Sequence, residues 1–191
     1  MKTQQVGIAL VLWLVAAATA VAAGLLARVP PPAVVAVLAA LVVFVSFAAP
    51  GLRQWVRTAD LRLLLVPHLI RFVGVVFLIL VSRGVLAPAF TPIGWGDTVA
   101  ASGALVLLLV GLPITSSGRW WTWLAWNSFG LADMALLVVT GIRLATTAPE
   151  QFTLFRHLPF GLLPTFAVPL IIATHVFIYI RLFMLRGRSA A

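Results

Sequence analysis

Apolar stretches of about 20 residues recur along this chain, and they constrain its fold more than any other feature. This is the length that a helix needs to cross the hydrocarbon core of a bilayer. Of the 191 residues, 63% are hydrophobic and 9% are charged, whereas soluble domains carry about 25% charged residues. Too little polar surface remains to cover a water-soluble protein. The sequence therefore predicts an all-α fold, a polytopic bundle of transmembrane helices.

The connections between the apolar stretches are short, so we expect one transmembrane domain over residues 1–191. Small residues near positions 18–20 are compatible with a cleavable signal peptide, but the surrounding apolar run is long for one. We expect a retained first helix. The predicted spans are six, at about residues 6–27, 33–49, 61–87, 97–115, 120–144 and 161–183.

The basic residues predict the orientation, because lysine and arginine are enriched on the cytoplasmic side of membrane proteins. Eight fall on one side and four on the other, so both termini are expected in the cytoplasm. The eight are Lys2, Arg53, Arg57, Arg62, Arg119, Arg181, Arg186 and Arg188. The four are Arg28, Arg83, Arg143 and Arg156.

The formal charge of +9 does not indicate a nucleic-acid partner, because the basic residues are scattered at helix ends and form no basic face. They are placed to anchor the chain in lipid headgroups, and the lipid bilayer is the expected partner. The chain has no cysteine, which excludes disulfides, thiolate metal sites and iron–sulfur clusters.

Five polar side chains are predicted to lie within the spans: His68, Arg71, Asn127, Asp133 and His175. Such residues are costly in a membrane and usually face the interior of the bundle. With a rise of about 1.5 Å per residue, the two histidines lie about 9 Å from their nearest inner basic residues, Asn127 about 12 Å and Arg71 about 13 Å. Asp133 lies just beyond this layer. We therefore predict that Arg71 pairs with Asp133 across the third and fifth spans.

Asp97 follows a segment rich in proline and glycine and is predicted to cap the fourth helix, because an N-cap carboxylate accepts orphan N–H groups. The alternative is a functional acid at the outer surface. The four tryptophans within residues 119–126 are predicted to form an aromatic belt at the membrane interface, with a binding cage as the alternative.

Two prolines bear on the backbone within the spans. Pro67 marks either a bend in the third span or the start of that span. Pro169 removes a backbone hydrogen bond and frees the carbonyl of Thr165 one turn earlier, which makes this carbonyl a candidate ligand or proton acceptor.

Four segments of the third to sixth spans carry a resemblance: RFVGVVF at 71–77, GWGD at 94–97, WNSFGLAD at 126–133 and PTFAVPLIIATH at 164–175. With these segments the chain resembles an uncharacterised family of bacterial six-helix integral membrane proteins, for which no activity is known. The pattern includes no histidine at position 68. The resemblance implies a multi-pass protein of the cell inner (plasma) membrane and transfers no chemistry.

Three hypotheses of function remain open. The first is a small carrier or proton-linked component, in which Arg71, Asn127, Asp133 and His175 form a ligand or proton site. The second is a non-catalytic subunit or scaffold of a membrane complex, with the chain itself or another membrane subunit as its partner. The third is a b-type haem protein with His68 and His175 as axial ligands.

The sequence does not favour an enzyme. It contains no HExxH zinc motif, no nucleophile elbow and no run of metal-binding carboxylates. We therefore predict no catalytic residue and no metal site.

Overall fold

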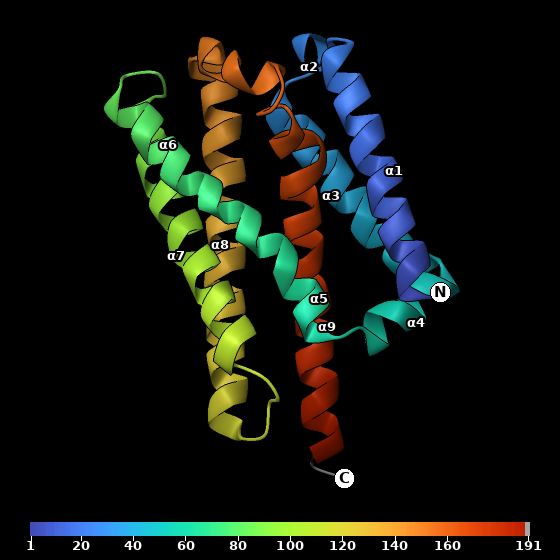
Figure 1. Ribbon diagram of the computed structural model, residues 1–191. Coiled ribbons are helices and arrows are strands. Elements are labelled where there is room, and N and C mark those ends of the chain that lie inside the picture. Colours follow the sequence, from blue (N-terminus) through green and yellow to red (C-terminus); the bar gives the residue numbers. More distant parts are fainter. Residues whose placement is uncertain (190–191) are drawn as a thin grey trace. The chain divides into compact units, whose positions relative to one another are not determined.

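The computed structural model describes residues 1–189, which are largely helical and contain no strand (Figure 1). Within this part of the chain, six helical stretches are long and apolar enough to cross a membrane. They are Thr3–Ala22, Pro31–Ala48, Leu61–Ser82, Pro88–Val110, Ser117–Thr147 and Leu163–Gly187. The prediction of an all-α protein with six membrane spans is thereby confirmed, and the chain is that of a multi-pass membrane protein.

The fourth span differs most from its prediction. It was expected at residues 97–115, but it begins with the short turn η2 (Pro88–Phe90) and continues as α7 (Thr91–Val110). Pro88 and Pro92 each stand in a first helical turn, where the missing N–H would have no partner anyway. Asp97 consequently lies inside α7, and the prediction that it caps this helix is wrong.

The internal contacts of the chain gather in two compact units. The first comprises Met1–Thr58 and Val138–Ala173, and the second comprises Ala59–Leu137 and the chain from Thr174 onward. The single membrane domain over residues 1–191 stays a prediction.

The first unit holds a tryptophan that satisfies a backbone group. The indole Nε1 of Trp13 donates to the carbonyl of Thr165 at 3.1 Å. This is the carbonyl that Pro169 leaves without its helical partner. Because this carbonyl accepts from Trp13, it contributes to the packing of the first unit.

The elements of the first unit are α1 (Thr3–Ala22), α2 (Leu25–Arg28), α3 (Pro31–Ala48), α4 (Pro50–Thr58), the end of α8 (Ser117–Thr147), η3 (Pro149–Phe152), η4 (Leu154–Arg156), η5 (Leu163–Ala167) and the start of α9 (Val168–Ser189).

In the second unit the third span changes its helical winding. It passes from α5 (Leu61–Leu65) through the 3-10 segment η1 (Val66–Phe72) into α6 (Val73–Ser82). Pro67 stands in the first turn of η1, so it marks this change inside the span and not the start of the span. Both η1 and α6 pack against α7 (Figure 1).

The crossing of these two spans is close because it is made at a glycine. A Cβ atom added to Gly74 would lie 2.7 Å from Asp97 Cβ and 2.9 Å from Thr98 Oγ1. Small residues let helix backbones approach in this way. This close approach places Asp97 of α7 beside η1.

The tryptophan-rich start of α8 contains both exposed and buried tryptophans. Trp121 is exposed, but Trp120 and Trp123 are buried, and the belt interpretation is wrong for these two. A buried indole N–H usually finds an acceptor. Three of the indoles donate to backbone carbonyls: Trp120 to Leu182 at 2.9 Å, Trp123 to Gly111 at 3.1 Å and Trp126 to Ala100 at 2.9 Å.

Candidate intramembrane polar site

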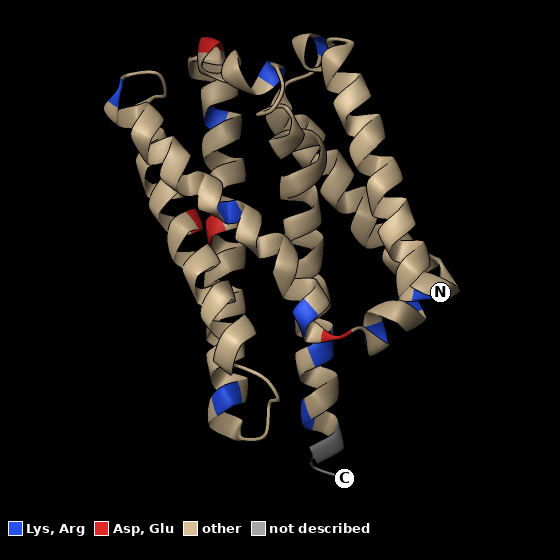
Figure 2. Ribbon diagram, viewed as in Figure 1, with Lys and Arg blue, Asp and Glu red and all other residues tan. Residues whose placement is uncertain are grey.

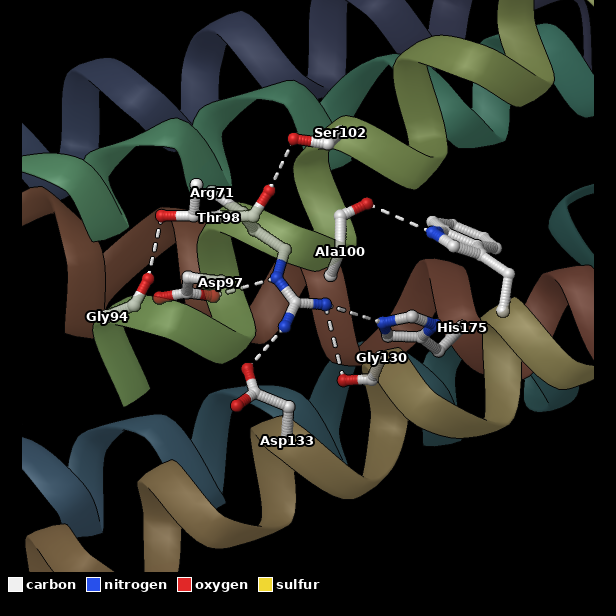
Figure 3. A network of polar contacts seen from close by, with 10 residues as sticks. Arg71, Gly94, Asp97, Thr98, Ala100, Ser102, Gly130, Asp133 and His175 are labelled. Atoms are coloured by element: carbon white, nitrogen blue, oxygen red, sulfur yellow. Dashed lines mark hydrogen bonds and ion pairs between the residues drawn. The ribbon is translucent and has the colours of Figure 1, made fainter. Parts of the chain in front are cut away.

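Arg71 lies on η1, is 1% exposed, and holds its guanidinium between two carboxylates (Figure 3). Its Nε donates to Asp97 Oδ1 at 2.7 Å, and its Nη2 donates to Asp133 Oδ2. Its Nη1 donates to the carbonyl of Gly130 at 3.2 Å and lies 3.3 Å from His175 Nε2. These contacts join η1 to α7, α8 and α9. The predicted pair of Arg71 and Asp133 is confirmed.

The charges of this site do not balance. Asp97 and Asp133 are 3% and 7% exposed, and both form ion pairs with the single guanidinium of Arg71. With all three groups ionised, the formal charge of the group is −1. Figure 2 shows acidic and basic positions meeting midway along the helices, whereas most other charged positions lie toward helix ends.

The hydrogen bonds of Asn127 determine the tautomer of His175. The Asn127 amide nitrogen donates to the carbonyl of His175 at 3.1 Å, which leaves its Oδ1 to accept. His175 Nδ1 lies 2.8 Å from this oxygen and therefore carries the proton. The lone pair of Nε2 is then free to accept from Arg71 Nη1. His175 is thus held as a neutral imidazole with its proton on Nδ1.

His68 lies beside this network and is linked to it by ring contacts. Its ring centroid is 4.3 Å from that of His175 and 5.0 Å from that of Trp126. His68 Nε2 lies 3.1 Å from Thr174 Oγ1. Its Nδ1 is buried and has no hydrogen-bond partner among the described residues.

The two histidines do not fit the axial positions of a haem. Axial ligands stand on opposite faces of the macrocycle, so a gap for a planar group has to separate the two rings. Here the rings of His68 and His175 are in direct edge contact, with an angle of 64° between their planes. Both nitrogens of His175 are also engaged, by Asn127 and Arg71. The two rings therefore leave no place for a haem between them.

Two glycines leave the space that the polar side chains occupy. A Cβ atom on Gly130 would lie 2.5 Å from His175 Cε1 and 3.0 Å from Arg71 Nη1. A Cβ atom on Gly96 would collide with the carboxylate of Asp133. A larger residue at either position would therefore displace a member of the site.

The structure brings together the four residues predicted as a ligand or proton site, Arg71, Asn127, Asp133 and His175. Asp97 is the member that sequence reasoning missed. The sequence signal for this position was the pair of prolines before GWGD, because these prolines start a helix ahead of Asp97. In residues 1–189, no group of three or more histidine, aspartate or glutamate side chains is arranged to hold a metal ion.

This arrangement is suited to holding a proton. The two carboxylates share one guanidinium, and a proton on either of them would make the group neutral. Ionisable groups within membrane spans commonly form proton relays or ligand sites. The contacts among the side chains leave the guanidinium surrounded by protein groups.

Comparison with curated proteins and with solved structures found no match. The model of one family, a domain of unknown function (DUF8737), matches residues 28–183. This range includes every residue of the polar site and all helices from α3 to η5, with most of α9. The chain therefore belongs to the DUF8737 family.

Proposed function

We propose that this protein is a small proton-linked membrane carrier, and that the site built on Arg71, Asp97, Asp133 and His175 binds and releases the proton. The proposal is carried by one observation: two buried carboxylates share a single buried guanidinium. A net charge in a low-dielectric interior is costly, and uptake of one proton removes it.

The carboxylates are the groups suited to exchange the proton. His175 accepts a hydrogen bond from Arg71 at Nε2, so a second proton on this ring would point an N–H at the guanidinium. Protonation of Asp97 or Asp133 meets no such conflict, because either residue keeps an oxygen for Arg71. Asn127 supports this division by fixing the His175 ring.

The proposed role can be tested by infrared difference spectroscopy of the purified protein in lipid nanodiscs. As the pH is lowered, the band of a buried protonated carboxyl should appear, and Asp97→Asn or Asp133→Asn should remove or shift it. Asp60→Asn is the matched control, because Asp60 is exposed and caps α5 through a bond to Arg62 N at 2.9 Å. If no buried carboxyl titrates while the protein stays folded, the site does not exchange protons.

A scaffold or non-catalytic subunit is the second candidate, and a specific observation favours it. The hydrogen bonds and ion pairs of Arg71 connect η1 with α7, α8 and α9, so the site also fixes the packing of these helices. In that role the protein would partner itself or another membrane subunit. A stable protein whose carboxylates never titrate would support this candidate against the carrier.

The proposed location and orientation rest on the sequence. We assign the protein to the bacterial inner membrane by its resemblance, and both termini to the cytoplasm by the distribution of basic residues. Neither assignment depends on the chemistry of the polar site.

A further inference from the structure

A groove runs between α7 and α8 and reaches one of the two carboxylates. Its volume is about 500 Å³, within the range of about 300–1,000 Å³ that ligand pockets occupy. Asp133 is its charged residue, and the other lining residues are apolar or glycine. The lining residues that matter below are Trp95, Gly96, Val99, Phe129, Ala132 and Asp133.

The groove opens on the outer face of these helices. Trp95, Val99 and Phe129 are 59%, 53% and 45% exposed, whereas Asp133 is 7% exposed. In a membrane span, such an apolar rim faces the hydrocarbon of the lipid. A molecule that enters the groove from the bilayer would therefore meet apolar surface first and a carboxylate last.

The two oxygens of Asp133, a lining residue of the groove, have different neighbours. Arg71 bonds Asp133 through Oδ2. The position that a Cβ atom of Gly96 would take is closest to Oδ1. Gly96 thus makes room for Oδ1, which packs against it in the lining of the groove, and an ammonium group at this oxygen would leave the bond between Arg71 and Oδ2 in place.

The negative charge of the site favours a positively charged ligand. The ionised group of Arg71, Asp97 and Asp133 has a formal charge of −1, which a cation would complement. Charge-assisted hydrogen bonds to carboxylates are about twice as strong as neutral ones. The aromatic rings at Trp95 and Phe129 add a surface for an apolar chain.

From these observations we infer that the groove binds a lipophilic amine, with its ammonium group at Asp133 and its apolar chain between Trp95 and Phe129. The inference rests on the proposed function, because the proton and the ammonium group would neutralise the same negative charge. Each would exclude the other, so binding of the amine would be coupled to release of a proton.

The test uses decylammonium and the purified full chain in phosphatidylcholine nanodiscs, with empty nanodiscs as the blank for partitioning. Saturable binding is expected, with decanol and decyl sulfate at least about tenfold weaker because they lack the positive charge. Lowering the pH should weaken decylammonium binding, since the proton competes for the carboxylates.

Two variants distinguish the groove from other sites. Asp133→Asn removes the charge, and Ala132→Phe fills the groove from an exposed position, so each should weaken binding by about tenfold or more. Ala135→Phe is the matched control, because Ala135 is exposed on the same helix and does not line the groove. Ala132→Phe replaces no member of the polar site and therefore keeps the test valid if Asp133→Asn fails to fold.

Several outcomes would overturn the inference. Equal binding of decanol would show that the groove holds an alkyl chain without charge recognition. Decylammonium binding that survives Ala132→Phe would place the cation elsewhere. Self-association that Ala132→Phe abolishes would show that a second copy of the chain covers the groove. If the buried carboxyl titrates but no amine binds, the inference fails and the proposed function stands. If the amine binds without any titration, the proposed proton exchange and its coupling to the amine both fail, and only the amine site stands.

Discussion

Removing Arg71 should destabilise the protein strongly, and removing its two partners as well should restore part of the loss. Arg71→Leu leaves Asp97 and Asp133 buried without a counter-charge. Breaking a buried ion pair in this way costs about 3–5 kcal/mol. Nε2 of His175 also loses its donor, and a buried unpaired acceptor adds about 1–3 kcal/mol.

The aspartate variants should behave differently because each leaves a balanced pair. Asp97→Asn or Asp133→Asn alone removes one negative charge, keeps an amide oxygen that can accept from Arg71, and leaves Arg71 with one carboxylate, so the loss should not exceed about 1.5–3 kcal/mol. The triple variant with Arg71→Leu, Asp97→Asn and Asp133→Asn contains no buried charge at this site. It should be more stable than Arg71→Leu alone by at least about 2 kcal/mol.

Reversible unfolding in mixed micelles, titrated with sodium dodecyl sulfate, would measure these free energies. Arg83→Leu is the control for loss of an arginine, because Arg83 is exposed beyond the end of α6. A triple variant that is no more stable than Arg71→Leu alone would refute the reasoning. The three residues would then contribute independently, and the ion pairs would not determine the energetics of the site.

Three further predictions address the packing, the tautomer and the topology. Gly130→Ala should destabilise the protein by about 1–3 kcal/mol because its Cβ meets His175 and Arg71, whereas Gly7→Ala, with nothing within 4 Å of the added Cβ, should be neutral or slightly stabilising in the same unfolding assay. Nitrogen-15 NMR should show the proton of His175 on Nδ1, because Asn127 Oδ1 accepts there while Arg71 donates to Nε2; a proton on Nε2 in the unaltered protein would contradict the hydrogen-bond assignment. Reporter fusions at the two ends of the chain should both give cytoplasmic signals, and a signal from the opposite side at one end would mean that the span map is wrong.

The spans and the central ion pair could be predicted because they depend on strong local signals. Runs of apolar residues determine where a helix can cross the bilayer. Within such runs a charged residue is rare, so Arg71 and Asp133 were natural partners at similar depth, as the structure confirms. The neighbouring His175 and Asn127 followed from the same comparison of depths.

Asp97 was missed because glycine and proline are found both in turns and in helices. The prolines and glycines before Asp97 are typical of a turn, but Pro88 and Pro92 start helical turns, and Gly94 lies in α7. The close packing of Gly94 against the third span appears only in three dimensions, where an added Cβ would lie 2.9 Å from the side chain of Leu78. Sequence alone does not distinguish a glycine that permits a turn from one that permits a helix crossing.

The burial of the tryptophans shows a similar limit. Membrane-interface and buried tryptophans both combine an apolar ring with a polar N–H. A tryptophan can be buried where a carbonyl lies within reach of its N–H. The acceptor of Trp120 is the carbonyl of Leu182 in α9, and that of Trp123 is the carbonyl of Gly111 at the end of α7. These partners are set by the fold of the second unit, so the expected belt was wrong for both residues.

The energetics of Arg71 favour a role beyond packing. Placing an arginine in the middle of a membrane span costs about 2.5–3.5 kcal/mol on insertion scales. Its guanidinium has four interhelical contacts, and such contacts average about 0.6 kcal/mol each, so together they fall just short of offsetting the insertion of the arginine. The burial of Asp97 and Asp133 adds a further cost, and apolar residues of similar volume could hold these helices at least as well. A triple variant that folds, yet no longer titrates and no longer binds decylammonium, would separate the two roles: the helices would keep their packing while the charge that attracts a proton or an amine would be gone.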